Sequence, residues 1–317
     1  MTTIKQDHHS LSGAPTIRLA SRASQLALAQ AEEVAAQLDD AEIITFSTRG
    51  DEVLDRPLAE IGGKGLFVKT LERAMLTGEA DAAVHSGKDM ETQYADGTTI
   101  AAFLQRADRR DALIGDYARF EDLPQGAVVG TASVRRAAII KSIRPDVSTK
   151  LLRGNVNSRL AQLDAGHYDA IVLAMAGMQR LGFSQRIHPI AEDVMLPAAA
   201  QGAIAIQALA DDGTEQRRDM LEKLTALNHH ETAIEVTAER ALLDQLDGTC
   251  ETPIGASAYY QDGMVKLTAQ LLSPDGDAVF TAVDHAHEDD AEALGRQLAD
   301  QLLADAGGRA FLEKTKH

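Results

Sequence analysis

The chain contains no tryptophan, and aromatic residues make up only 4% of its 317 residues. Its hydrophobic cores must therefore be largely aliphatic, and binding that depends on stacking nucleic-acid bases on aromatic rings is disfavoured. The longest apolar run, Ile171 to Met178, is far shorter than the roughly 18 residues that a membrane-spanning helix needs. The first residues, MTTIKQDHHSLSG, lack the apolar core of a signal peptide. We therefore expect a cytoplasmic protein with no membrane partner.

Cysteine is almost absent as well, because Cys250 is the only one in the chain. Disulfides within the chain and cysteine-rich metal sites are therefore excluded, and the thiol is either an inert buried side chain or a functional group. His229-His230-Glu231 does not form the HExxH pattern of zinc enzymes, and we interpret it as the beginning of a helix. We predict no metal site.

Common nucleotide-binding and hydrolase motifs are incomplete or missing. Gly62-Gly63-Lys64-Gly65 superficially resembles a phosphate-binding loop, but no Ser or Thr follows Lys64 and the GxxxxGK[ST] spacing is missing. Val68 stands where the GxGxxG pattern requires glycine, and no GxSxG segment is present. Nucleotide binding and serine-hydrolase chemistry are therefore disfavoured.

Basic residues are in the minority, with 31 Lys and Arg against 48 Asp and Glu and a formal net charge of −17. Such a charge opposes general binding to nucleic acids or anionic membranes, so any anion site must be local. One stretch, Gly130 to Arg186, reverses the balance with nine Lys and Arg against three Asp. It is either a solvated face or, since arginine predominates, a binding site for a ligand with several carboxylates or phosphates.

Apolar runs alternate with amphipathic helical patterns from Thr16 onward, which predicts an α/β fold with largely parallel sheets. The alternation restarts after Arg106 to Asp111, so we expect two similar α/β units. The expected strands are 16–20, 42–48, 81–85, 127–131, 150–154 and 169–174, and the expected helices are 24–38, 66–76, 133–143, 156–166 and 229–246.

The chain length suggests two or three domains. Beyond Cys250, strand-like segments, Asp-Gly turns and an acidic helix predict a small α+β domain with an antiparallel sheet. The apolar segment after Gly202 is expected to return to the first unit. The predicted domains are 1–104 with the return segment 203–225, 108–200, and 229–317.

Two serines and an acid follow predicted strands. Ser24 and Ser133 each begin a helix beside arginine, so each is either an N-cap, worth about 1 kcal/mol, or part of an anion site at a helix N-terminus. Lys88 and Asp89 come directly after a buried strand, where α/β sheets place ligands. Asp89 either stabilises a cationic intermediate or binds a donor N–H, or it forms a salt bridge with Lys88 or Arg22.

These segments are part of six sequence blocks that occur in a fixed order along the chain. Through these blocks, nearly the whole chain resembles the porphobilinogen deaminase family, also called hydroxymethylbilane synthases. Six ordered blocks are far more specific than any one motif. The blocks are LASRASQLALAQ, TRGDEVLDRPLAEIGGKGLFVKTLE, DAAVHSGKDM, GTASVRRAAI, LLRGNVNSRLAQLDAGHYDAIVLAMAGMQRLG and LDGTCETPIGA.

The resemblance implies two doubly wound α/β domains like those of periplasmic binding proteins, and a small third domain that bears the cysteine. It implies a dipyrromethane cofactor joined to Cys250 by a thioether, and porphobilinogen as substrate. Each porphobilinogen brings an acetate and a propionate, which would explain an arginine-rich cleft in an acidic protein. The residues carried over as carboxylate binders are Arg22, Ser24, Arg135, Arg136, Arg153, Arg159 and Arg180, with Ser133 and Lys88 assisting.

The implied reaction is a transferase step in porphyrin and heme biosynthesis. Porphobilinogen loses ammonia to give a cationic azafulvene, which the free α-carbon of the terminal pyrrole attacks. Four additions and a hydrolysis release the linear tetrapyrrole and keep the cofactor. Asp89 is implied as the catalytic acid/base, with Lys88 beside it, and the family expectation is a monomer.

Some positions depart from the expected family pattern, namely Gln25, Glu60, Gly87 and Glu91, but none removes a residue with an assigned role. We hypothesise that Gly87 makes the Lys88-Asp89 loop more mobile. Two alternatives remain: a non-catalytic anion-binding module of the same architecture, and an enzyme of this fold that has lost its activity.

Overall fold

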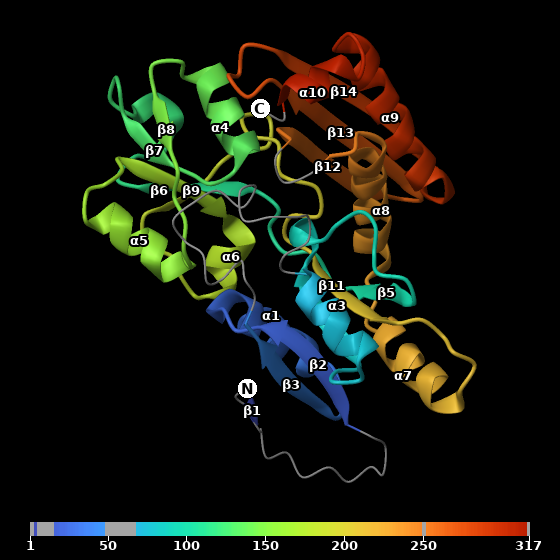
Figure 1. Cartoon of the computed structure of the whole chain (residues 1–317). Helices are drawn as coiled ribbons and strands as arrows, with labels where there is room; N and C mark the ends of the chain where they lie inside the picture. The colour runs from blue at the N-terminus through green and yellow to red at the C-terminus, as the bar shows by residue number, and fades with distance from the viewer. Residues whose placement is uncertain (1–2, 5–15, 48–67, 249–251, 316–317) are drawn as a thin grey trace.

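The computed structural model describes residues 3–4, 16–47, 68–248 and 252–315. Three sheets organise these residues, and each belongs to a separate part of the molecule (Figure 1). The first two are mixed sheets with helices, and the third is an antiparallel sheet in the C-terminal part. The expected fold class, two α/β units and a small α+β unit, is confirmed.

The first sheet has the strand order β1-β3-β2-β4-β11-β5. Strand β2 pairs in parallel with β3 and β4, whereas β11 is antiparallel to both β4 and β5. The core beneath it is aliphatic, with Leu19, Val34 and Ile206 fully buried. The elements of this unit are β1 (Thr3–Ile4), β2 (Ile17–Arg22), α1 (Gln25–Ala35), β3 (Ala41–Phe46), α3 (Val68–Leu76), β4 (Ala82–Ser86), η2 (Gly87–Asp89), β5 (Thr98–Phe103), β11 (Ile204–Leu209) and α7 (Glu215–Thr225).

The second sheet has the order β10-β6-β9-β7-β8. Strand β7 is parallel to β8 and β9, and β6 is antiparallel to β9 and β10. Val129, Ile140 and Val172 lie fully buried in its core. The elements are β6 (Asp111–Gly115), η3 (Phe120–Asp122), β7 (Val128–Gly130), α4 (Val134–Ile143), β8 (Ser148–Lys150), α5 (Val156–Asp164), β9 (Ala170–Ala174), α6 (Met175–Arg180) and β10 (Ile187–Pro189).

The third sheet is the antiparallel meander β12-β13-β14, and helices α8 and α9 pack against each other and against it. Alternation along β13 buries Val265, Leu267 and Ala269 on the helix side and exposes Met264 and Lys266. The elements are α8 (His230–Gln245), β12 (Ile254–Gln261), β13 (Met264–Leu272), β14 (Val279–His287), η4 (Glu288–Asp290), α9 (Ala291–Asp305) and α10 (Ala310–Thr315).

Two expectations about the α/β units are wrong. The sheets are mixed rather than largely parallel, because β6 and β11, which begin after the chain passes from one sheet to the other, run against their neighbours. The strand expected at 150–154 lies earlier, at Ser148–Lys150. The adjacent residues Leu151 and Leu152 belong to the connection that precedes α5. The apolar segment after Gly202 does return to the first sheet, as β11. The exact domain boundaries stay predictions.

A buried ion-pair cluster joins the passages between the two sheets to the third unit. The Arg106 guanidinium donates to both carboxylate oxygens of Glu239 on α8 (2.8 and 2.9 Å), and Arg109 pairs with Glu235 (2.7 Å). Glu239, fully buried, also accepts from the backbone N–H groups of Ala200 (2.6 Å) and Ala258 (2.7 Å). One carboxylate thus contacts both passages and β12.

No helix in the described part of the chain is both long enough and apolar enough to cross a membrane.

Candidate functional site

The predicted site residues follow the carboxyl ends of parallel strands in both sheets. In the first sheet, β2 ends at Arg22 and β4 is followed directly by η2, which contains Lys88 and Asp89. In the second, β7 is followed by Ser133 and β8 by Arg153. These edges are where α/β sheets bind ligands, so the fold provides the expected setting.

The two serines are helix N-caps. Ser24 Oγ accepts from the N–H of Ala27 at the beginning of α1 (3.3 Å), and Ser133 Oγ accepts from the N–H of Arg136 at the beginning of α4 (3.4 Å). The N-cap interpretation is therefore confirmed for both. Helix α1 is also tied to the end of β4, because Gln30 Nε2 donates to Ser86 Oγ (3.4 Å).

A buried carboxylate, Asp111, organises the arginines of α4. Arg135 Nη2 donates to its Oδ2 (2.8 Å), and Arg136 donates to its Oδ1 through both Nε (3.0 Å) and Nη2 (2.7 Å). Asp111 is completely buried, and Arg135 and Arg136 are only 3% and 7% exposed. Burial would raise the pKa of Asp111, but the two guanidinium groups hold that pKa well below its usual value.

Lys88 joins this cluster through an amide. Its Nζ donates to Gln201 Oε1 (3.2 Å), and Gln201 Nε2 donates in turn to Asp111 Oδ1 (2.9 Å). Burial, followed by the positive charge of Arg136, lowers the pKa of Lys88 to about 8. The ammonium group thus sits in an environment that already carries positive charge.

Asp89 lies among cations rather than in a closed ion pair. It is half-buried, and its negative charge acts on both Lys88 and Arg159. Burial lowers the pKa of Arg159 to about 10; the charges of Arg136 and Arg153 lower it further, and Asp89 opposes them. Arg159 Nε donates to the Gly154 carbonyl (2.8 Å). The structure therefore brings the Asp89 carboxylate and four basic side chains into one electrostatic cluster.

Helix α1 contacts the second unit at α5 and α6. Arg180 Nε, on α6, lies 2.9 Å from Glu33 Oε2 on α1, and Arg180 Nη2 donates to the Gly202 carbonyl (3.2 Å). Asn157 Nδ2 on α5 donates to Oε1 of Gln25, the first residue of α1 (2.6 Å). These bonds hold α1 of the first unit against α5 and α6 of the second.

The basic stretch 130–186 is largely engaged by protein carboxylates. Within the described residues, at least five of its nine basic residues have a carboxylate partner, so the net positive charge offered to a ligand is smaller than the sequence indicates. Those five are Arg135, Arg136, Arg144, Arg180 and Arg186. The charges of both Asp89 and Arg153 act on Arg159, and the ligand-binding roles of all these residues stay predictions.

Gly87 lies in close contact with the backbone of Ala200 and Ala203. This packing argues against the hypothesis that Gly87 makes the Lys88-Asp89 loop more mobile. A Cβ on Gly87 would lie 3.1 Å from both the Cβ and the carbonyl oxygen of Ala200, and 3.3 Å from the carbonyl oxygen of Ala203. Its N–H also donates to Ala203 O (2.9 Å). The glycine therefore lets η2 approach the backbone after α6 and β10.

Several sequence-based expectations fall outside the described residues: Cys250, Glu60 and the segment Gly62–Gly65. Sequence reasoning, in turn, missed Asp111, Gln201 and Glu239. The available signal for Asp111 was a charged residue opening an otherwise apolar strand, DALIG. In the described residues, no group of three or more His, Cys, Asp or Glu could hold a metal ion.

Solved structures similar to this chain include periplasmic and substrate-binding domains. One is the VFT2 domain of BvgS from Bordetella pertussis, with 14% identity, a TM-score of 0.39, and coverage of 67% of this chain and 86% of that domain. Another is the second substrate-binding domain of a putative amino acid ABC transporter from Streptococcus pneumoniae, with 15% identity, a TM-score of 0.40, and coverage of 67% and 93%. Similarity this low carries no functional argument.

Family models are far more specific. Residues 17–217 match "Porphobilinogen deaminase, dipyromethane cofactor binding domain", and residues 233–304 match "Porphobilinogen deaminase, C-terminal domain". The two matches follow each other along the chain and cover most of it. They support a dipyrromethane cofactor and hydroxymethylbilane synthase function in tetrapyrrole biosynthesis. The chain belongs to the porphobilinogen deaminase family of transferases.

Proposed function

We propose that this chain condenses four porphobilinogen molecules, with release of ammonia, and frees the linear tetrapyrrole by hydrolysis, which is the specific reaction of hydroxymethylbilane synthase. The observation that carries the proposal is the electrostatic cluster at the ends of β4 and β7, where Asp89 lies among Lys88, Arg136, Arg153 and Arg159. Cations suit the acetate and propionate groups of the substrate, and a carboxylate suits its ring N–H.

The residues present fit a dipyrromethane group. Lys88, Arg153 and Arg159 offer positive charge for its carboxylates, and Asp89 offers acceptor oxygens for its pyrrole N–H groups. Cys250 would hold it through a thioether. When bound, the group supplies the pyrrole carbon to which substrate units are joined. Arg135 and Arg136 contribute mainly by fixing α4, since Asp111 engages both guanidinium groups.

Asp89 acts on the reacting ring of the substrate. Its carboxylate accepts the ring N–H and stabilises the positive charge that develops when ammonia leaves. Lys88 and Arg159 keep the carboxylate in place through their charges, so that it is oriented before substrate arrives. Preorganised groups of this kind typically contribute several kcal/mol to lowering the barrier.

Lys88 is a positioning residue with a second task. Its bond to Gln201 fixes the η2 turn relative to the buried Asp111 cluster. With a pKa of about 8, it carries its charge at neutral pH and can bind a substrate carboxylate. A monomeric state and a cytoplasmic location are part of the same proposal.

The test of the Asp89 role is turnover of porphobilinogen by the holoenzyme and by an Asp89→Asn variant. We expect kcat to fall about 100-fold or more, with KM much less changed, because the amide keeps its shape but cannot stabilise the cation. Asp96→Asn is the matched control, since Asp96 is exposed on a nearby turn. An Asp89→Asn enzyme with wild-type kcat contradicts the proposal.

A further inference from the structure

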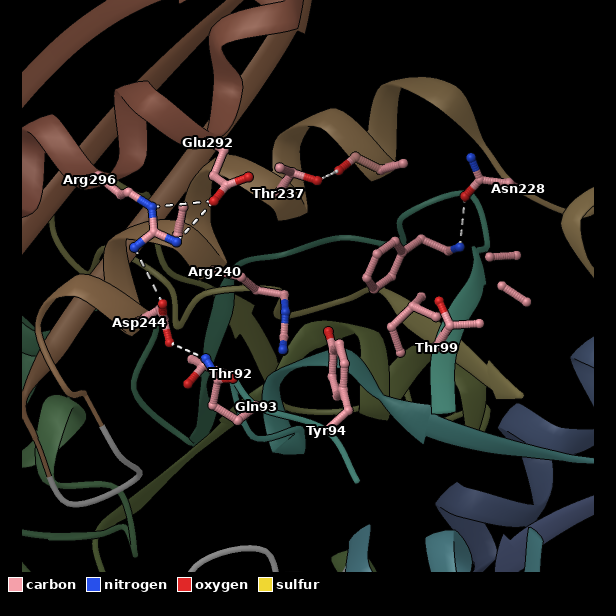
Figure 2. Close-up of a pocket in the computed structure, with 16 residues that line it drawn as sticks. Thr92, Gln93, Tyr94, Thr99, Asn228, Thr237, Arg240, Asp244, Glu292 and Arg296 are labelled. Atoms are coloured by element: carbon pink, nitrogen blue, oxygen red, sulfur yellow. Dashed lines mark hydrogen bonds and ion pairs between the residues drawn. The ribbon is translucent and has the colours of Figure 1, made fainter. Parts of the chain in front are cut away.

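A second hollow, apart from the Asp89 cluster, lies where the first α/β unit meets the third. The cavity has a volume of 510 Å³ and lies between β5, the segment 92–94 and helices α8 and α9 (Figure 2). Neither Lys88, Asp89 nor Arg159 lines it. Its volume is in the range of small-molecule sites, about 300–1,000 Å³, and such sites are common at domain interfaces.

One wall of this cavity is apolar and comes from β5 and α8. Ile100 and Phe103 on β5 and Ala233 on α8 line it, and Tyr94 packs on the same apolar cluster. Figure 2 shows the Tyr94 ring beside Arg240. Burial raises the pKa of Tyr94, so its hydroxyl remains a neutral hydrogen-bond donor at physiological pH. A flat apolar ring is the kind of ligand body that such walls favour.

One arginine of the cavity engages both of its carboxylates. Arg296 donates to Glu292 through Nη2 (2.9 Å), and its Nη1 lies 3.4 Å from Asp244 Oδ2. The other oxygen of Asp244 accepts from Gln93 Nε2 (2.8 Å). These side chains therefore form a hydrogen-bonded rim with two carboxylates to one guanidinium, and Arg240 is the other cation among the described lining residues.

Arg240 is different, because its contacts with the described residues include no carboxylate. Its Nη2 donates to the backbone carbonyl of Glu91 (2.5 Å), and its Cζ lies 5.1 Å from the centre of the Tyr94 ring. Among the residues that the structure describes, no carboxylate lies within ion-pair distance of it. A half-buried guanidinium beside an apolar wall gives this cavity one group that can bind an anion.

We propose that the cavity binds a small organic anion, a carboxylate carried on a flat apolar ring. The carboxylate pairs with Arg240, and the ring lies against Tyr94, Ile100 and Phe103. The Tyr94 hydroxyl can donate to the same carboxylate. An arginine–carboxylate pair is charge-assisted and bidentate, which gives the ring a defined orientation.

Occupancy of this cavity would act on the Asp89 cluster. Glu91, whose carbonyl Arg240 holds, is two residues after Asp89, and Gln93 is tied to α8 through Asp244. A bound carboxylate competes with the Glu91 carbonyl for Arg240 and so loosens the link between α8 and the turn that contains Lys88 and Asp89. This effect on turnover rests on the proposed function, whereas binding itself does not.

The test is titration of the purified holoenzyme with 2-naphthoate, followed by calorimetry, with neutral 2-naphthamide as the matched probe. We expect saturable binding of the naphthoate only. Arg240→Gln should weaken it about ten-fold or more, as loss of a charged hydrogen bond predicts. Thr237→Trp, which fills the cavity from an exposed position on α8, should weaken it too. Arg119→Gln, at the exposed N-cap of η3 and outside the cavity lining, is the control.

The Arg159→Gln variant distinguishes binding in this cavity from binding at the Asp89 cluster, where carboxylates are also expected to bind. The variant should bind the naphthoate as the wild type does. Loss of binding in Arg159→Gln with retention in Arg240→Gln would assign the probe to the cluster and overturn the proposal. Equal binding of the naphthamide, or no saturable binding, would overturn it as well. These readouts require no turnover, so they stand even if the proposed function fails.

Discussion

Replacement of Asp111 by Asn directly tests the buried ion pairs that hold Arg135 and Arg136 in the candidate site. The carboxylate is fully buried and is the only ion-pair partner that the described residues give to Arg135 and Arg136, which are themselves buried. Asn keeps the shape and one acceptor oxygen but leaves two guanidinium charges in the interior without compensation. Breaking a buried pair in this way costs about 3–5 kcal/mol, so the free energy of unfolding should fall by that amount.

The assay is urea unfolding followed by far-ultraviolet circular dichroism, since the chain has no tryptophan to report by fluorescence. Asp122→Asn is the control, because Asp122 pairs with Arg119 on the surface, and we expect no measurable change there. A second variant, Asp111→Asn with Arg135→Met, should recover part of the loss by removing one uncompensated charge. An Asp111→Asn protein within about 1 kcal/mol of the wild type would refute the argument.

Three further perturbations test other parts of the account. The Lys88 ammonium is present below its pKa of about 8 and lost above it, so kcat/KM should decline as pH rises through 8. Lys88→Arg should abolish this decline, and an unchanged decline in that variant contradicts the role of Lys88. Gly87→Met should lower the free energy of unfolding by about 1–3 kcal/mol, because its Cβ meets Ala200 at 3.1 Å, and an unchanged melting temperature would show that the turn is not tightly packed. Glu239→Gln should cost about 3–5 kcal/mol, measured by urea unfolding, because it leaves the buried Arg106 and Arg109 to share the single carboxylate of Glu235. A loss below about 1 kcal/mol would argue that this cluster does not hold the three units together.

Local sequence patterns predicted much of the fold. Helical spacing and strand-like runs located α1, α3, α4, α5 and α8 to within a few residues, and Asp-Gly turns located the antiparallel meander. The direction of β6 and β11 was beyond reach, because hydrophobic periodicity reports which face a strand buries and carries no information about the direction of its neighbours.

The sequence predicted where the candidate site lies, but it did not predict which carboxylates pair with the arginines. Lys88 and Asp89 were expected after a buried strand, and the structure has them there. The carboxylates that engage the arginines come from distant segments: Asp111 is 24 residues from Arg135, and Glu239 is 133 residues from Arg106. A count of basic residues cannot reveal such partners. For the same reason Gly87 suggested freedom in the sequence, whereas its neighbours Ala200 and Ala203 show close packing.

The central claim is that this chain builds its tetrapyrrole on a dipyrromethane group held by Cys250. The most direct measurement is the intact mass of the purified protein beside that of a Cys250→Ser variant. We predict that the wild type exceeds its sequence mass by two porphobilinogens less two ammonias, and that the variant shows no excess. A wild-type protein whose mass equals that of its sequence, and stays so after incubation with porphobilinogen, would contradict the claim.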